Sequence, residues 1–219
     1  MEGAGQCIKV ALKLHTLIPL PKEVKEVTIM STAVMTKRIT ETSPSLKARI
    51  AGVFYLLCFA TGISALFVRG RLGLLAGLTA GACYVAVTLL FYYIFKPVSR
   101  RLSLLAAVIS LVGCAMGPLS LFHLVPVRIN SLVFFGFYCL LIGYLILRSA
   151  FLPRILGVLM AIAGVGWLTF LSPALGNRLT PYIFAPGIIG EGALTLWLLA
   201  MGVNAERWNE QAEVSGRRI

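Results

Sequence analysis

Glu191 is the residue whose position in the sequence points most directly to chemistry. It lies ten residues into Pro181–Val203, a stretch that is otherwise free of charge. About 20 helical residues cross a hydrocarbon core of roughly 30 Å, so this spacing predicts a carboxyl group near the middle of a membrane. A charged side chain at that depth costs about 2.5 to 3.5 kcal/mol. We therefore expect Glu191 to be largely protonated and hydrogen-bonded inside the protein.

Two interpretations of Glu191 stay open. A buried acid can carry a proton or hold a ligand, or it can form a neutral structural hydrogen bond between helices. Three polar side chains lie at a similar depth when residues are counted from the ends of the apolar runs: Thr61, Tyr84 and Tyr138. Together with Glu191 and His123, they are the candidate ligand-binding residues. No catalytic residue is assigned.

The polar residues near the ends of the apolar runs have ordinary explanations as well as functional ones. His123 could contact a ligand, but a lone histidine at a membrane surface is commonly a polar anchor. Ser120 precedes it by one helical turn, which is weak evidence for a hydrolase without an oxyanion site. Arg148 and Arg154 could hold lipid phosphate, and a role in setting topology explains them equally.

Four cysteines fall near the centres of four successive apolar runs. Thiolates at one depth could hold a soft metal ion, but zinc sites usually combine closely spaced cysteines with histidine. The chain has no CxxC pair, and cysteine also suits tight helix packing. We therefore predict no metal site and no bound cofactor. The four residues are Cys58, Cys83, Cys114 and Cys139.

Other enzyme classes are disfavoured by what the sequence lacks. No aspartate occurs anywhere, which argues against paired-aspartate proteolysis and against the metal-binding aspartates of phosphoryl transfer. Neither HExxH nor GxxxxGK[ST] is present. Because His123 is the one histidine near the apolar runs, a haem held by two histidines is not expected.

Composition indicates a membrane protein. The 219 residues are 58% hydrophobic and 13% charged, with a mean hydropathy of +0.90, which leaves too little polar surface for a soluble protein. The net charge of +12 comes from basic residues between apolar runs rather than from one patch with aromatic residues, so we expect no nucleic-acid partner. The lipid bilayer is the expected partner, and oligomerisation stays open.

Six apolar runs with short charged joints predict an all-α polytopic membrane protein, a bundle of six transmembrane helices within residues 48–204. Short joints require consecutive helices to pack as antiparallel hairpins. Residues 1–47 form a cytoplasmic segment that we expect to be disordered or a start-site extension, and residues 205–219 form a short, frayed cytoplasmic tail. The six runs are Ile50–Val68, Leu72–Phe95, Leu102–Val125, Ile129–Leu147, Ile155–Leu171 and Tyr182–Val203.

Positive charge predicts the orientation. Twelve Lys and Arg residues fall on one side of the predicted spans and four on the other, so both termini are expected in the cytoplasm of a bacterium, with the spans in its inner membrane. The richer side carries Lys37, Arg38, Lys47, Arg49, Lys96, Arg100, Arg101, Arg148, Arg154, Arg207, Arg217 and Arg218; the other carries Arg69, Arg71, Arg128 and Arg178.

Glycine and proline patterns predict how the spans pack. Small residues every four positions let helix backbones approach closely in a membrane, and proline inside a helix removes a backbone donor. The second run has three such glycines and the third has two, which predicts a compact bundle, and two prolines predict kinks. These residues are Gly73, Gly77, Gly81, Gly113 and Gly117, with Pro118 and Pro186.

Several segments resemble a known family. Gly143–Gly164, GYLILRSAFLPRILGVLMAIAG, is the most specific, and Ala48–Leu66, Cys83–Ala107 and Ile188–Asn204 are similar too. They resemble a bacterial integral-membrane family known as domain of unknown function 4386, from which this chain departs by shorter joints after the first and third runs. The resemblance implies a multi-pass membrane fold and supplies no activity.

These observations predict a membrane protein that binds or moves a small or lipid-like ligand near Glu191. The first alternative is a structural or accessory subunit whose buried acid only joins helices. A lipid-modifying enzyme is the third hypothesis, and it would need Ser120, His123 and Arg128 to converge on a pocket.

Overall fold

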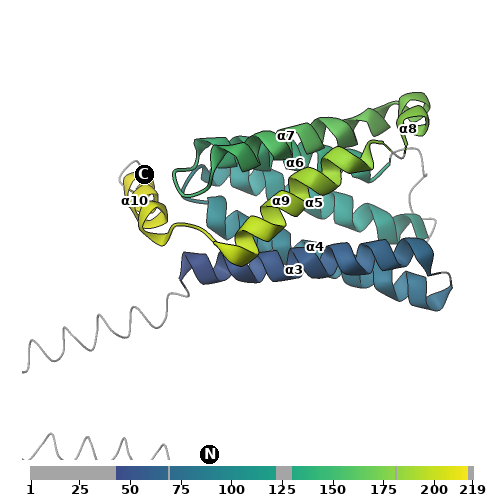
Figure 1. The fold of residues 1–219 in the computed structure, drawn as a ribbon, viewed down its shortest axis with the longest axis horizontal. Coiled ribbons are helices and arrows are strands. Elements are labelled where there is room, and N and C mark those ends of the chain that lie inside the picture. The colour runs from purple at the N-terminus through teal and green to yellow at the C-terminus, as the bar shows by residue number, and fades with distance from the viewer. Residues whose placement is uncertain (1–42, 69, 122–129, 181, 217–219) are drawn as a thin grey trace, which may run out of the picture. The chain divides into compact units, whose positions relative to one another are not determined.

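The computed structural model describes residues 43–68, 70–121, 130–180 and 182–216, and this part of the chain contains helices and no strand. The predicted all-α class is confirmed for these residues. Figure 1 shows the helices, with α9 running at an angle across its neighbours and α10 turning away from it. The elements are α3 Pro44–Phe67, α4 Arg71–Phe95, α5 Arg100–Leu121, α6 Leu132–Arg148, α7 Arg154–Leu168, η1 Thr169–Leu171, α8 Pro173–Leu179, α9 Phe184–Ala200 and α10 Ala205–Gly216.

Among the described residues, three stretches are long and apolar enough to cross a membrane: Pro44–Ala65, Arg71–Phe95 and Arg154–Leu171. A fourth is added if α9 and α10 count as one span, although they meet at a bend of 105°. The predicted count of six is not confirmed by these lengths. α6 and α9 are not counted as single spans because each has 17 residues, fewer than the roughly 20 that cross a hydrocarbon core.

The outer surface of these helices is apolar. Phe67 is 82% exposed, Leu72 69% and Ile155 61%, and only 22% of the apolar windows of α3 and α4 is buried. Exposing apolar surface to water costs about 25 cal/mol of free energy for each Å², whereas contact with lipid chains does not carry this cost. The apolar helices are therefore compatible with a membrane protein.

α3 begins six residues before the apolar run predicted at Ile50. Ser43 provides the cap, since its Oγ accepts a hydrogen bond from the backbone N–H of Leu46 at 3.1 Å, and Pro44 occupies the first helical position. Both residue types favour a helix start, because serine satisfies a free N–H and proline has none to satisfy.

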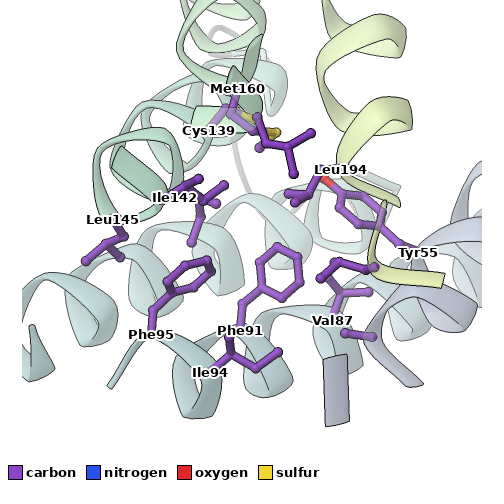
Figure 2. Close-up of a cluster of buried hydrophobic side chains, with 14 of the residues drawn as sticks. Tyr55, Val87, Phe91, Ile94, Phe95, Cys139, Ile142, Leu145, Met160 and Leu194 are labelled. Atoms are coloured by element: carbon purple, nitrogen blue, oxygen red, sulfur yellow. The ribbon is translucent and has the colours of Figure 1, made fainter. Parts of the chain in front are cut away.

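The buried core lies along the second half of α4. No residue of α4 is buried before Cys83, whereas Val87, Phe91 and Phe95 are almost fully enclosed. Figure 2 shows Phe91 and Phe95 pointing toward side chains of α6 and α9. Edge-on aromatic contacts link Phe91 to Tyr55 of α3 at 6.0 Å and to Phe95 at 5.8 Å between ring centroids. One half of α4 is thus packed and the other is not.

α6 and α7 make a close backbone contact, and glycines permit it. A Cβ added to Gly143 or to Gly157 would lie 2.8 Å from the carbonyl oxygen of the other residue. Seven residues further along α7, a Cβ on Gly164 would lie 2.8 Å from the carbonyl oxygen of Gly136. Small residues therefore bring these two backbones together, as membrane helices often require.

Of the three glycines predicted to pack the second run, Gly73 does so, since a Cβ there would overlap the carbonyl oxygen of Val68 just after α3, but the other two do not. A Cβ on Gly81 would meet nothing within 4 Å, and one on Gly77 would only just reach Ala65 at 4.0 Å. The expectation of close packing through Gly77 and Gly81 is wrong, because the spacing of glycines does not reveal what lies opposite them. Gly113 of α5 does pack closely, since a Cβ added there would lie 3.0 Å from the Cβ of Phe134 of α6. The surroundings of Gly117 lie outside the described residues.

Pro186 does not interrupt a helix, in contrast to the prediction. It lies in the first turn of α9, which begins at Phe184, and backbone N–H groups in a first turn have no helical partner to lose. The run Tyr182–Val203 is therefore helical only from Phe184. The side chain of Pro118 in α5, the other predicted kink, lies outside the part of the chain that the structure describes.

The tail is a packed helix rather than a frayed one. Gly202 has φ +67°, which lets the chain turn sharply between α9 and α10. Asn204 Oδ1 then caps α10 by accepting from Arg207 N at 3.1 Å. Trp208 Nε1 donates to the carbonyl oxygen of Ile94 at 2.8 Å, and Gln211 Oε1 accepts from Ala150 N at 3.1 Å. α10 is thus hydrogen-bonded to the end of α4 and to the joint between α6 and α7.

The α6–α7 contact predicts the effect of adding one methyl group. Gly157→Ala should lower the stability of the folded protein by about 1 to 3 kcal/mol, because backbone and Leu147 block the new Cβ. Gly192→Ala is the matched control, since nothing lies within 4 Å of its Cβ. Thermal unfolding of both variants in detergent measures the difference. Equal midpoints would show that the two helices do not depend on this contact.

Candidate functional site

The carboxyl group of Glu191 joins four helices. Its Oε2 accepts from Tyr55 Oη of α3 at 2.6 Å, and its Oε1 accepts from Trp167 Nε1 of α7 at 2.8 Å. Cys139 Sγ of α6 donates weakly to Oε1 at 3.8 Å. Glu191 itself belongs to α9 and is 6% exposed. Each oxygen of this buried acid therefore has a partner, as buried polar atoms require.

The sequence of α9 explains why Glu191 points inward. Its buried positions recur three and four residues apart, which places them on one helix face, and two of them are glycines beside α7. A Cβ on Gly190 would lie 2.6 Å from the carbonyl oxygen of Leu159, and one on Gly187 would overlap the indole of Trp167. These glycines bring α9 close enough for Trp167 to reach the acid.

All three hydrogen-bonding partners of Glu191 are neutral. The indole N–H of Trp167 can only donate, so Oε1 must be an acceptor. The other oxygen, Oε2, is hydrogen-bonded to Tyr55 Oη. When the acid is protonated, either Oε2 or Tyr55 Oη can be the donor of this bond. This geometry suits a neutral acid with Oε1 as its carbonyl oxygen. The protonated state of Glu191 stays a prediction.

A cavity of about 760 Å³ reaches Glu191. Its lining comes from α3, α4, α5, α6, α7 and α9 and is mainly small or apolar. The unpacked first half of α4 supplies one wall, in which Gly73, Gly77 and Gly81 replace larger side chains with bare backbone. Gly77 and Gly81, which have no close neighbour, thus border open space.

Two tyrosine hydroxyls near this cavity lack partners. Tyr84 Oη and Tyr138 Oη are buried without a hydrogen bond to any described residue, and Tyr84 lines the cavity. The two rings lie edge to face with centroids 5.9 Å apart, and Tyr84 also lies 5.6 Å from Tyr55. An unpaired buried hydroxyl costs about 1 to 3 kcal/mol. An unpaired hydroxyl on a residue that lines a cavity is a candidate ligand contact.

The structure places the predicted site residues in different surroundings. Tyr84 shares the cavity with Glu191, and Tyr138 packs beside Tyr84. Thr61 is elsewhere engaged, since its Oγ1 donates to Leu57 O on its own helix at 2.7 Å. His123 lies outside the described residues, as do Arg128 and the side chain of Ser120, so the lipid-enzyme hypothesis gains nothing from the structure.

The two joint arginines lie away from the acid. The Arg148 guanidinium lies over the ring of Tyr144, 5.8 Å from its centroid, and the Arg148 carbonyl oxygen accepts from Gln211 Nε2 at 3.4 Å. Arg154 is exposed and begins α7. Binding of lipid phosphate by these residues stays a prediction.

The four cysteines of the apolar runs are free thiols with separate surroundings. Cys58 and Cys114 line the cavity, Cys83 is buried in α4, and Cys139 contacts Glu191. Within the described ranges, no group of three His, Cys, Asp or Glu side chains lies close enough to hold a metal ion. Cys139 therefore acts in this structure as a small side chain with a weak donor.

Tyr55 and Trp167 are the residues that sequence analysis missed. Both are amphipathic aromatic residues inside apolar helices, which is the one signal that could have identified them. Counting depth from the ends of the runs did not, because α9 begins later than expected and crosses its neighbours at an angle (Figure 1).

Fold and site together define a class: a helical protein with three to four helices of membrane-spanning character and a buried acid where its helices meet. The chain belongs to the family described as Domain of unknown function (DUF4386), which matches residues 69–131 and 128–202. The predicted resemblance is confirmed, although Ala48–Leu66 precedes the matched residues.

The chain is also similar to an uncharacterized protein of Archaeoglobus fulgidus. The two are 28% identical over 127 residues, which cover 54% of this chain and 76% of the relative. No solved structure matches the chain. The comparisons therefore establish the family and leave its biochemical role unknown.

The hydrogen bonds of Glu191 predict different effects for two substitutions. Glu191→Leu should lower stability by about 1 to 3 kcal/mol, because the Trp167 N–H and Tyr55 O–H lose their acceptor. Glu191→Gln should cost less than about 1 kcal/mol, since its carbonyl can accept from Trp167 and its amide can donate to Tyr55. Unfolding in detergent measures both. Equal losses would mean that the site needs the acid itself rather than its hydrogen bonds.

Proposed function

We propose that this protein binds, or carries across the membrane, a small and mainly apolar ligand with one polar group in the cavity beside Glu191. The observation that carries the proposal is that one cavity is lined both by Glu191 and by Tyr84, whose hydroxyl is buried without a hydrogen-bond partner among the described residues. Buried polar atoms are normally paired, so an unpaired hydroxyl on a residue that lines a cavity points to a missing partner.

The size and lining of the cavity support a ligand of this chemistry. Small-molecule sites commonly measure about 300 to 1,000 Å³ and are mostly apolar with a few polar groups, which the 760 Å³ cavity resembles. The glycine surface of α4 offers flat backbone to a ring or chain, and Phe135 and Trp167 provide aromatic walls. Tyr84 Oη can donate to or accept from a carbonyl or hydroxyl group of the ligand.

The structural alternative has its own support. Glu191 fastens α9 to three other helices and is almost fully enclosed. Such an acid could serve packing alone, in an accessory subunit without a ligand. Tyr84 separates the two hypotheses, because its hydroxyl contributes no hydrogen bond to the described structure.

We also propose that the protein is a six-span protein of the bacterial inner membrane with both termini in the cytoplasm. The support is the excess of basic residues on one side of the apolar runs, as the positive-inside rule requires. α6 and α9 are short for this role, and adjacent polar turns or a thinner bilayer around them would compensate.

The ligand proposal predicts opposite effects of one substitution on binding and stability. Tyr84→Phe should leave stability unchanged or slightly raised, because it removes an unpaired buried hydroxyl, yet it should weaken ligand binding about tenfold. Mass spectrometry of molecules that copurify with each protein would identify the ligand and measure its loss. Identical copurifying molecules in equal amount would favour the structural alternative.

Filling the cavity is a second, independent test of the ligand proposal. Gly81→Leu places a side chain in open space and should displace the ligand without unfolding the protein. Thr79→Leu, on the exposed side of the same helix, is the matched control and should retain the ligand. Retention of the same ligand by Gly81→Leu would remove the cavity as its site.

Reporter fusions test the proposed topology. A green fluorescent protein fused after Ile219 should fluoresce and an alkaline phosphatase there should be inactive, because the first works in the cytoplasm and the second outside it. Fused after Arg178, one predicted span earlier, the two reporters should exchange activities. If the reporters at Arg178 and at Ile219 indicated the same side of the membrane, no single span could lie between these two residues.

A further inference from the structure

A second pocket, of about 410 Å³, lies where α10 closes over the ends of α3, α4 and α5. It shares no lining residue with the Glu191 cavity. Trp208 forms one wall and is held by its hydrogen bond to the carbonyl oxygen of Ile94 at 2.8 Å. The pocket is therefore a fixed hollow rather than a gap beside a loose tail.

Three cations from different parts of the chain line this pocket. Lys47 comes from α3, Lys96 from the joint after α4, and Arg100 from the first turn of α5. No acidic residue is among the described residues that line it, although α10 carries Glu206, Glu210 and Glu213 elsewhere on its surface. Opposite charges attract, so three cations around one hollow favour an anion there.

The rest of the lining is apolar or aromatic. Ile94 and Pro97 contribute aliphatic surface, while Tyr93 and Trp208 are residues that prefer the boundary between lipid and water. The pocket also lies at the end of two apolar helices, where the polar head groups of a bilayer would be. A free phosphate ion would use the cations and leave this surface without a partner.

We propose that this pocket binds the phosphate group of an anionic phospholipid, with the glycerol and the beginning of the acyl chains against its apolar side. Basic pockets between membrane helices on the cytoplasmic face recognise acidic lipid head groups in this way. Arg100 can hold two phosphate oxygens at once, and the two lysines add point charges. The site is independent of the ligand proposed for the Glu191 cavity.

The test titrates the purified full chain in detergent with a short-chain phosphatidylglycerol and follows binding by native mass spectrometry. Each of Lys47→Gln, Lys96→Gln and Arg100→Gln should weaken binding about fivefold, and the triple variant about a hundredfold. Arg101→Gln is the control, because Arg101 neighbours Arg100 in sequence but does not line the pocket. It should change binding less than twofold.

Three results would overturn the proposal: equal binding of phosphatidylcholine, an Arg101→Gln loss as large as that of Arg100→Gln, or binding of inorganic phosphate without binding of the lipid. Thermal unfolding of each variant without lipid shows that the fold is intact. Gly81→Leu, which fills the other cavity, should bind phosphatidylglycerol normally, so the failure of one site is distinguishable from the failure of the other.

Discussion

Burial removes the carboxyl group of Glu191 from water, so its hydrogen bonds must come from the protein. The structure meets this requirement with donors from three helices: Tyr55 of α3, Cys139 of α6 and Trp167 of α7. α9 can bring the acid to them because Gly187 and Gly190 permit close approach to α7. The arrangement of four helices thus depends on the hydrogen bonds of one side chain. These four helices also line the neighbouring cavity.

α4 divides the molecule into a packed part and an open part. From Cys83 onward its side chains fill the core with Val87, Phe91 and Phe95, whereas before Cys83 its glycines border the cavity. Close packing between helices comes instead from α6 and α7, where Gly143 and Gly157 bring backbones into contact. Glycine therefore serves two opposite purposes here: it permits contact between α6 and α7 and between α7 and α9, and it leaves space beside α4.

Sequence reasoning identified what depends on composition and on single residues. The all-α class, the family and the unusual position of Glu191 follow from hydropathy and from short local patterns. The partners of Glu191 do not, because Tyr55 is 136 positions away and its approach depends on how α3 and α9 cross. The same limit explains the glycines of α4 and the expected kink at Pro186, since spacing alone reveals neither the opposite surface nor the first residue of a helix.

The sharp turn at Gly202 gives the last helix a mechanical role. A Cβ at this position would lie 2.7 Å from Ser45 Oγ, so the turn is seated on the start of α3, while Trp208 and Gln211 attach α10 to the end of α4 and to the α6–α7 joint. Displacing α10 must therefore break these hydrogen bonds or move their partners with it. The same turn joins α10 directly to α9, the helix that carries the buried acid.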